Sequence, residues 1–196
     1  MTFSDFQRQY DAVAQEKGEG YFPFHFAGMS GDELAHARSM LLERALAGDT
    51  VDLDGLRLVG DATTVTGLRA AANRVASLGA RWDIVRRETL FQLTSEPAEL
   101  EPLLAMTDGG SDDEAKMAAE ALARHSLPGD FGERIAERLT DGRHECIVGP
   151  LVDAWLASRG VRIWEMSVFQ KHLTFIKAAC AAGPARRKKI LADVQL

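Results

Sequence analysis

One helix–turn–helix pattern returns several times along the chain, and this repetition constrains the fold more than any other feature of the sequence. Residues 122–139 and 156–173 begin 34 positions apart, and both segments open with Leu-Ala and close with Leu 17 positions later. In each segment a break that contains glycine precedes apolar residues at helical spacing. A repeat of roughly 30–35 residues made of two short helices is typical of an α-solenoid.

Two earlier segments have the same outline. In the first, Leu58 precedes a Gly-Asp turn and Leu68 follows ten positions later. In the second, Leu93 precedes a Ser-Glu-Pro turn and Leu103 again follows ten positions later. The sequence therefore predicts an all-α fold, an α-solenoid of helix pairs preceded by extra N-terminal helices.

The predicted domain organisation is a single all-helical domain over residues 1–196 with three parts. N-terminal helices and an aromatic segment occupy 1–50, and about four helix-pair repeats occupy 51–182. A basic helix occupies 183–196.

Local signals place several helix ends and core positions. Ser30 followed by Glu33 predicts a capping box, and Asp61 is expected to be the N-cap of the second helix of the first repeat. The apolar stripes predict three buried residues: Leu68, Leu103 and Ile135.

The first 31 residues predict one helix and one extended segment. Ser4 is a suitable N-cap for a helix that ends near Gly18. Residues 21–31 are aromatic, contain Pro23 and lack a helical period, which predicts an extended segment packed on the first helices. His25 is expected to fill a wall of aromatic side chains, and a functional surface histidine is the alternative.

The chain is acidic, with a net charge of −6 and a pI of about 5.4. Nucleic acid is therefore not expected as the main partner, because phosphate binding needs a basic surface. No apolar stretch is long enough to cross a membrane and the N-terminus does not resemble a secretory signal, so we expect a cytoplasmic protein. The basic run 186–189 is interpreted as a solvated helix end that complements an acidic neighbour.

Two cysteines and two tryptophans fall within apolar patterns. Cys146 and Cys180 are predicted to be buried free thiols, which favours a reducing compartment. Trp155 and Trp164 are predicted to lie in the core or at the end of the stack, with an exposed binding tryptophan as the alternative.

The sequence has no catalytic signature. Its five histidines form no HxxxH pair, and no GxSxG or phosphate-binding loop occurs. We therefore predict a protein that is not an enzyme and has no catalytic residue, metal or cofactor. The acidic loop 107–114 fails the spacing of an EF-hand, so Asp112 and Asp113 are expected to cap a helix instead.

Residues 56–173 resemble HEAT-like repeat proteins. The resemblance is carried by LRLVGDATTVTGLRAAANRV, residues 56–75, and by the segments that begin at Leu122 and Leu156. It implies a HEAT-like α-solenoid. The chain departs from the family pattern at Pro150 and in its long last repeat helix.

Small acidic cytoplasmic HEAT-like proteins include bacterial immunity proteins, and this chain is similar to them in size, charge and lead-in helices. The resemblance implies a non-enzymatic immunity protein that binds and neutralises a cognate toxin. An acidic surface suits fast association with a basic toxin domain. The predicted partner-binding residues lie on the second helices and on the loops between repeats: Glu99, Glu101, Asp108, Asp112, Asp113, Glu133 and Glu137.

Two other functions remain open at this point. One is a HEAT-like DNA glycosylase, which needs a basic concave face, whereas the second helices mix glutamates with arginines. The other is a scaffold subunit of an enzyme complex, which the sequence does not distinguish from an inhibitor.

Overall fold

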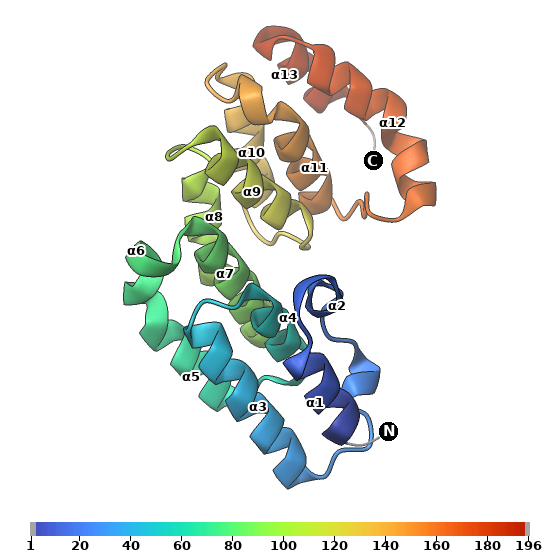
Figure 1. Ribbon diagram of the computed structural model, residues 1–196. Helices are drawn as coiled ribbons and strands as arrows, with labels where there is room; N and C mark the ends of the chain where they lie inside the picture. The colour runs from blue at the N-terminus through green and yellow to red at the C-terminus, as the bar shows by residue number, and fades with distance from the viewer. Residues whose placement is uncertain (1–2, 195–196) are drawn as a thin grey trace. The chain divides into compact units, whose positions relative to one another are not determined.

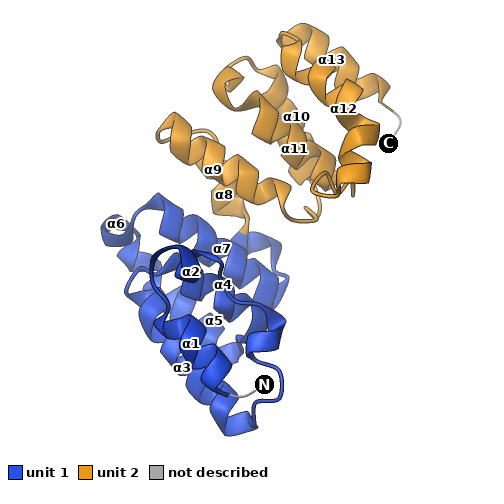
Figure 2. Cartoon of the chain, turned by 45° about the vertical axis from the view of Figure 1, so that its right-hand side comes forward, with its two compact units in different colours: residues 1–99 blue, residues 100–196 orange. Residues whose placement is uncertain are grey.

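The computed structural model describes residues 3–194, and within that range the chain is helical and contains no strand. The all-α prediction is therefore confirmed. The chain divides into two compact units, Met1–Glu99 and Leu100–Leu196 (Figure 2). The expected single domain over 1–196 stays a prediction.

The first unit contains the N-terminal helices and the first part of the region that the sequence predicts to consist of repeats (Figure 1). Its elements are α1 (Phe3–Asp11), α2 (Ala14–Gly18), η1 (Pro23–His25), α3 (Gly31–Leu46), α4 (Thr50–Val59), α5 (Ala62–Ala70), η2 (Ala71–Arg74), α6 (Val75–Leu78), α7 (Ala80–Thr94) and η3 (Pro97–Glu99). Helix α4 packs against both α3 and α7, and α5 packs against α7. Their shared core includes the fully buried side chains Phe6, Leu41, Leu53, Leu56, Leu68 and Leu90.

The turn between α4 and α5 forms as the sequence predicts. Gly60 has no room for a side chain, because a Cβ would lie 2.7 Å from the carbonyl oxygen of Leu56 and 2.8 Å from Cδ1 of Leu93. Asp61 caps α5 by accepting a hydrogen bond from the backbone N–H of Thr64 at 3.0 Å. The predicted capping box at the start of α3 is also present.

The N-terminal region differs from the prediction in two places. The expected single helix from Ser4 is divided into α1 and α2, with Ala14 in the left-handed region at φ 51°. The expected extended segment contains a 3-10 turn, η1, where the backbone N–H of Phe22 donates to Nδ1 of His25 at 2.9 Å. His25 is buried among aromatic rings as predicted, and the Phe24 ring centroid lies 4.1 Å away.

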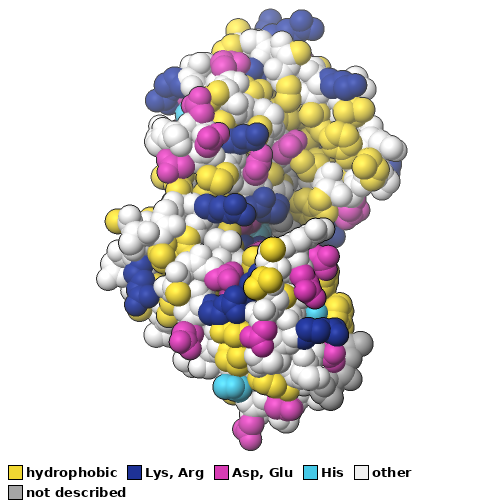
Figure 3. All heavy atoms as spheres, in the orientation of Figure 1, with side chains coloured by type: hydrophobic (Ala, Val, Ile, Leu, Met, Phe, Trp, Pro, Cys, Tyr) yellow, Lys and Arg dark blue, Asp and Glu magenta, His cyan; other side chains and the backbone are white. Residues whose placement is uncertain are grey.

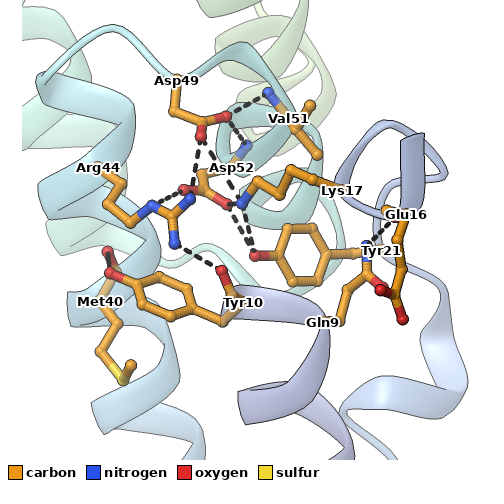
Figure 4. A network of polar contacts seen from close by, with 10 residues as sticks. All are labelled: Gln9, Tyr10, Glu16, Lys17, Tyr21, Met40, Arg44, Asp49, Val51 and Asp52. Carbon is orange, nitrogen blue, oxygen red and sulfur yellow. Dashed lines mark hydrogen bonds and ion pairs between the residues drawn. The ribbon is translucent and has the colours of Figure 1, made fainter. Parts of the chain in front are cut away.

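A buried carboxylate attaches this N-terminal region to α3 and α4 (Figure 4). Asp52 is fully buried, its Oδ1 accepts from the Tyr21 hydroxyl at 2.7 Å and contacts Lys17 Nζ, and its Oδ2 lies 2.9 Å from Nε of Arg44. Burial, and then the hydrogen bond to Asp52, raise the pKa of the Tyr21 hydroxyl well above its usual value, so the phenol stays a donor. The two cations compensate the charge that burial would otherwise penalise.

The second unit contains the rest of the predicted repeat region and the C-terminal helices. Its elements are α8 (Glu101–Met106), α9 (Asp112–Ala123), α10 (Phe131–Thr140), η4 (Glu145–Ile147), α11 (Val148–Ser158), α12 (Met166–Ala181) and α13 (Pro184–Asp193). Helix α11 packs against α9, α10 and α12, and α13 packs against α10 and α12. The buried core includes Leu103, Leu104, Leu122, Ile135, Leu139, Leu151 and Leu156.

One residue of the C-terminal basic run is buried, contrary to the expectation of a solvated helix end. Arg187 is 1% exposed, donates to the carbonyl oxygens of Leu139 at 2.6 Å and Ala179 at 3.0 Å, and pairs with both carboxylate oxygens of Glu145. The carbonyls at the C-terminal ends of α10 and α12 lack partners within their own helices. The Arg187 guanidinium supplies those partners and joins the two helix ends.

Both cysteines are exposed, so the prediction of buried thiols is wrong. Cys146 lies in the short turn η4, before the buried part of α11 begins. Cys180 lies on α12, where Ala179 is the buried residue.

Helix α12 is covered less than its long apolar stripe suggests. Trp155 of α11 is 2% exposed, as expected, but Trp164 before α12 is 54% exposed and Met166 is 69% exposed. Figure 3 shows apolar side chains gathered on the surface of the second unit on its α11–α12 side. The expected core position of Trp164 is therefore wrong, because the connection that leads into α12 lies at the surface.

We expect Leu68→Ala, Leu103→Ala and Ile135→Ala each to lower the free energy of unfolding by about 2–5 kcal/mol, because each removes a fully buried side chain and leaves a cavity. Urea unfolding followed by circular dichroism measures the effect. Leu58→Ala is the control, because Leu58 is 43% exposed. Losses as small as that of the control would contradict the assigned core.

Candidate functional site

Three of the seven predicted partner-binding carboxylates are paired with arginines of their own unit. In the first unit, Oε1 of Glu99 accepts from Arg69 Nε at 2.8 Å, and the same guanidinium binds Glu96 at 2.6 Å. The Glu99 side chain is 12% exposed. This carboxylate therefore connects α5 to η3.

In the second unit, two predicted carboxylates connect α8 and the residues after it to α10. Glu101 receives two parallel hydrogen bonds from Arg134, at 2.8 Å and 2.7 Å, and these bonds raise the pKa of the guanidinium. Asp108 contacts Nη2 of Arg138 and lies 3.3 Å from Nε2 of His144. A bidentate arginine–carboxylate pair has a fixed geometry, so it orients the helices that carry it.

Asp112 and Asp113 lie in the first turn of α9, as predicted, with Ser111 as the N-cap of a capping box. Both side chains are exposed. Asp112 accepts a hydrogen bond from the thiol of Cys146 at 3.4 Å, and Asp113 forms no ion pair with any residue in 3–194. The two carboxylates thus remain accessible at a helix N-terminus, where the helix dipole favours negative charge.

A small cavity of about 150 Å³ separates the loop 107–112 from residues 143–147. Two contacting pairs line it, Asp108 with His144 and Asp112 with Cys146. Over the described range of the chain, no group of three or more His, Cys, Asp and Glu side chains is placed to hold a metal ion. The hydrogen bond to Asp112, with burial second, raises the pKa of the Cys146 thiol, which makes it a weaker nucleophile at neutral pH.

Glu133 and Glu137 are exposed and one turn apart on α10. They line a cavity of about 370 Å³. Trp155 of α11, Arg159 at the C-terminal end of α11, and Lys188 of α13 line the same cavity. Their surroundings therefore differ from those of the other five carboxylates.

The sequence shows arginines on the same helices as these glutamates, but it did not predict which arginine pairs with which carboxylate. Arg134 lies 33 residues after Glu101, and Arg138 lies 30 residues after Asp108. These separations are close to the predicted repeat length, so opposite charges at that spacing are the signal that could have identified the pairs. Lys188 and Leu191 lie three positions apart on α13, and this spacing is the sequence signal for one wall of the larger cavity.

Comparison of the chain with protein-family models, with curated proteins and with solved structures finds no match. The resemblance to HEAT-like proteins therefore rests on the residues that carry it in the sequence.

We expect Asp112→Asn to accelerate the reaction of Cys146 with a disulfide reagent several-fold at mildly alkaline pH. The carboxylate raises the pKa of the thiol, so its neutralisation lowers that pKa and increases the thiolate fraction. The measurement is the stopped-flow absorbance of the released thiol in a Cys180→Ser background.

Asp113→Asn is the matched control, because it removes a neighbouring charge on the same helical turn without a hydrogen bond to the thiol. Equal acceleration by both variants would show that the Asp112–Cys146 contact does not control the thiol.

Proposed function

We propose that this chain is a non-enzymatic protein-binding module, and more specifically an immunity protein that binds and neutralises a basic toxin domain. The observation that carries the proposal is the pair of exposed carboxylates Asp112 and Asp113 at the start of α9. Unlike Glu101 and Asp108, these carboxylates form no ion pair with an arginine among the described residues. A basic partner is the chemistry that complements them.

The packing within each unit supports a HEAT-like solenoid as the framework of this module. The first helices of successive repeats pack on each other, α4 on α7 in one unit and α9 on α11 in the other. The second helices are joined by ion pairs, as between α8 and α10. Both features are those of stacked repeats, in which each repeat contacts its neighbours and the outer helices form a binding face.

The same ion pairs argue against DNA as the partner. Arg69, Arg134 and Arg138 lie on the second helices, and each is bound to a carboxylate of its own unit. An arginine paired with a carboxylate belongs to a group with no net positive charge, and such a group attracts a phosphate less than a free arginine does. A scaffold subunit remains compatible with the same surface, and the nature of the captured partner distinguishes it from an inhibitor.

The proposal is tested by the kinetics of association with the partner, captured from the native host with the purified chain as bait. We expect Asp113→Lys to lower the association rate constant several-fold at low ionic strength, with a smaller effect at high salt, because exposed charges steer encounter and are screened by salt. Surface plasmon resonance at two salt concentrations measures the rate.

Asp32→Lys is the matched control, because Asp32 is exposed and occupies the same position in the capping box of α3 as Asp113 does in that of α9. Both variants place a lysine at the second position of a helix with a capping box, and urea unfolding of each variant measures its effect on folding, so a difference in association rate reports the partner surface. An on-rate unchanged by Asp113→Lys, or lowered equally by Asp32→Lys, would remove the start of α9 from the interface. A captured partner whose activity persists when bound would argue for a scaffold.

A further inference from the structure

The cavity of about 370 Å³ in the second unit is an open pocket lined by residues of three helices, and it has walls of opposite charge. Helix α10 supplies Glu133 and Glu137, one turn apart, and α13 supplies Lys188 and Leu191. Arg159 follows the C-terminal end of α11. The volume of about 370 Å³ falls within the range of roughly 300–1,000 Å³ that is usual for small-molecule sites.

The apolar wall of the cavity is held in a fixed position. Trp155 is 2% exposed, its ring is stacked on that of Phe175 at a centroid distance of 5.6 Å, and the Arg159 guanidinium carbon lies 5.3 Å from its centroid. The indole Nε1 is buried and has no hydrogen-bond partner among the described residues. Buried indole N–H groups usually have an acceptor, so this residue of the cavity wall has an unsatisfied donor.

The charged side chains around the cavity do not neutralise one another. Within residues 3–194, no ion pair joins the two glutamates to Arg159 or Lys188, nor does any of the four pair elsewhere. This contrasts with Glu101 and Glu145 in the same unit, each of which is bound by an arginine. A cavity with only cations would favour an anionic ligand and one with only carboxylates a cationic ligand, whereas this cavity presents both.

We propose that this cavity binds a small zwitterion with an apolar body, of the class of the α-amino acids. Glu133 and Glu137 would receive the ammonium group, and Arg159 and Lys188 the carboxylate. The apolar side chain would contact Trp155 and Leu191. The proposal is independent of the protein partner, because it rests on a cavity that excludes Asp112 and Asp113.

Isothermal titration calorimetry with the full chain tests the required charges on the ligand. The probes are L-leucine and L-phenylalanine, leucinamide, which lacks the carboxylate, and 4-methylpentanoate, which lacks the ammonium group. We expect at least one of the two amino acids to bind with a millimolar or lower dissociation constant, and leucinamide and 4-methylpentanoate to bind about tenfold more weakly or not at all, because each leaves one charged wall without a partner. Absence of binding by both amino acids at millimolar concentration, or equal affinity for leucinamide, would overturn the proposal.

Matched variants locate the binding in this cavity. Glu137→Gln and Lys188→Gln should each weaken amino-acid binding about tenfold, since each removes one charge-assisted contact. Lys189→Gln and Glu120→Gln should leave the affinity unchanged, because both residues are exposed and do not line the cavity. All four positions are at the surface, so circular dichroism should show the same fold. Wild-type affinity in both cavity variants would place the ligand elsewhere and refute the assignment.

Discussion

In both units, ion pairs between arginines and carboxylates join elements that are distant in the sequence and orient the helices that carry them. Arg44 binds the buried Asp52 in the first unit, and Arg187 binds Glu145 in the second. Arg134 joins α10 to Glu101 at the start of α8. The apolar core supplies most of the stability, and these contacts of defined direction add orientation between neighbouring helices. Removing one member would leave a charge without its partner, which is costly where the pair is buried.

This use of charge decides which acidic residues remain for a partner. From the net negative charge of the chain, the carboxylates were predicted to form a binding face. The structure instead shows Glu99, Glu101 and Asp108 bound to arginines within their units. Asp112 and Asp113 remain exposed at the start of α9, and the proposed docking function therefore rests on them.

The features that the sequence predicted well are local ones. A capping box needs only Ser30 and Glu33, and the buried positions of Leu68 and Ile135 follow from apolar spacing along one helix. Within the candidate site, the helix-capping position of Asp112 and Asp113 was predictable for the same reason.

The features that were missed depend on contacts between distant segments. Arg187 is adjacent to three exposed or half-buried basic residues, and only the meeting of the α10 and α12 ends buries it. The apolar stripe of α12 predicts a buried helix, but Ala179 is the buried residue of this helix. How much of the stripe is covered depends on the helices that pack against it, which are α11 and α13. Lys188 and Glu137 line the same cavity only because α13 packs on α10, and the sequence did not predict that packing.

The contribution of an ion pair between helices is measured most directly by a double-mutant cycle on Glu101 and Arg134, with Glu101→Gln, Arg134→Met and the double variant unfolded in urea. Glu101 of α8 accepts two hydrogen bonds from Arg134 of α10, so we predict a coupling free energy of at least about 0.5 kcal/mol. Effects of the single changes that add to within about 0.3 kcal/mol would contradict it. That outcome would mean that the pair does not hold the helices together, and Glu101 would return to the residues available to a partner.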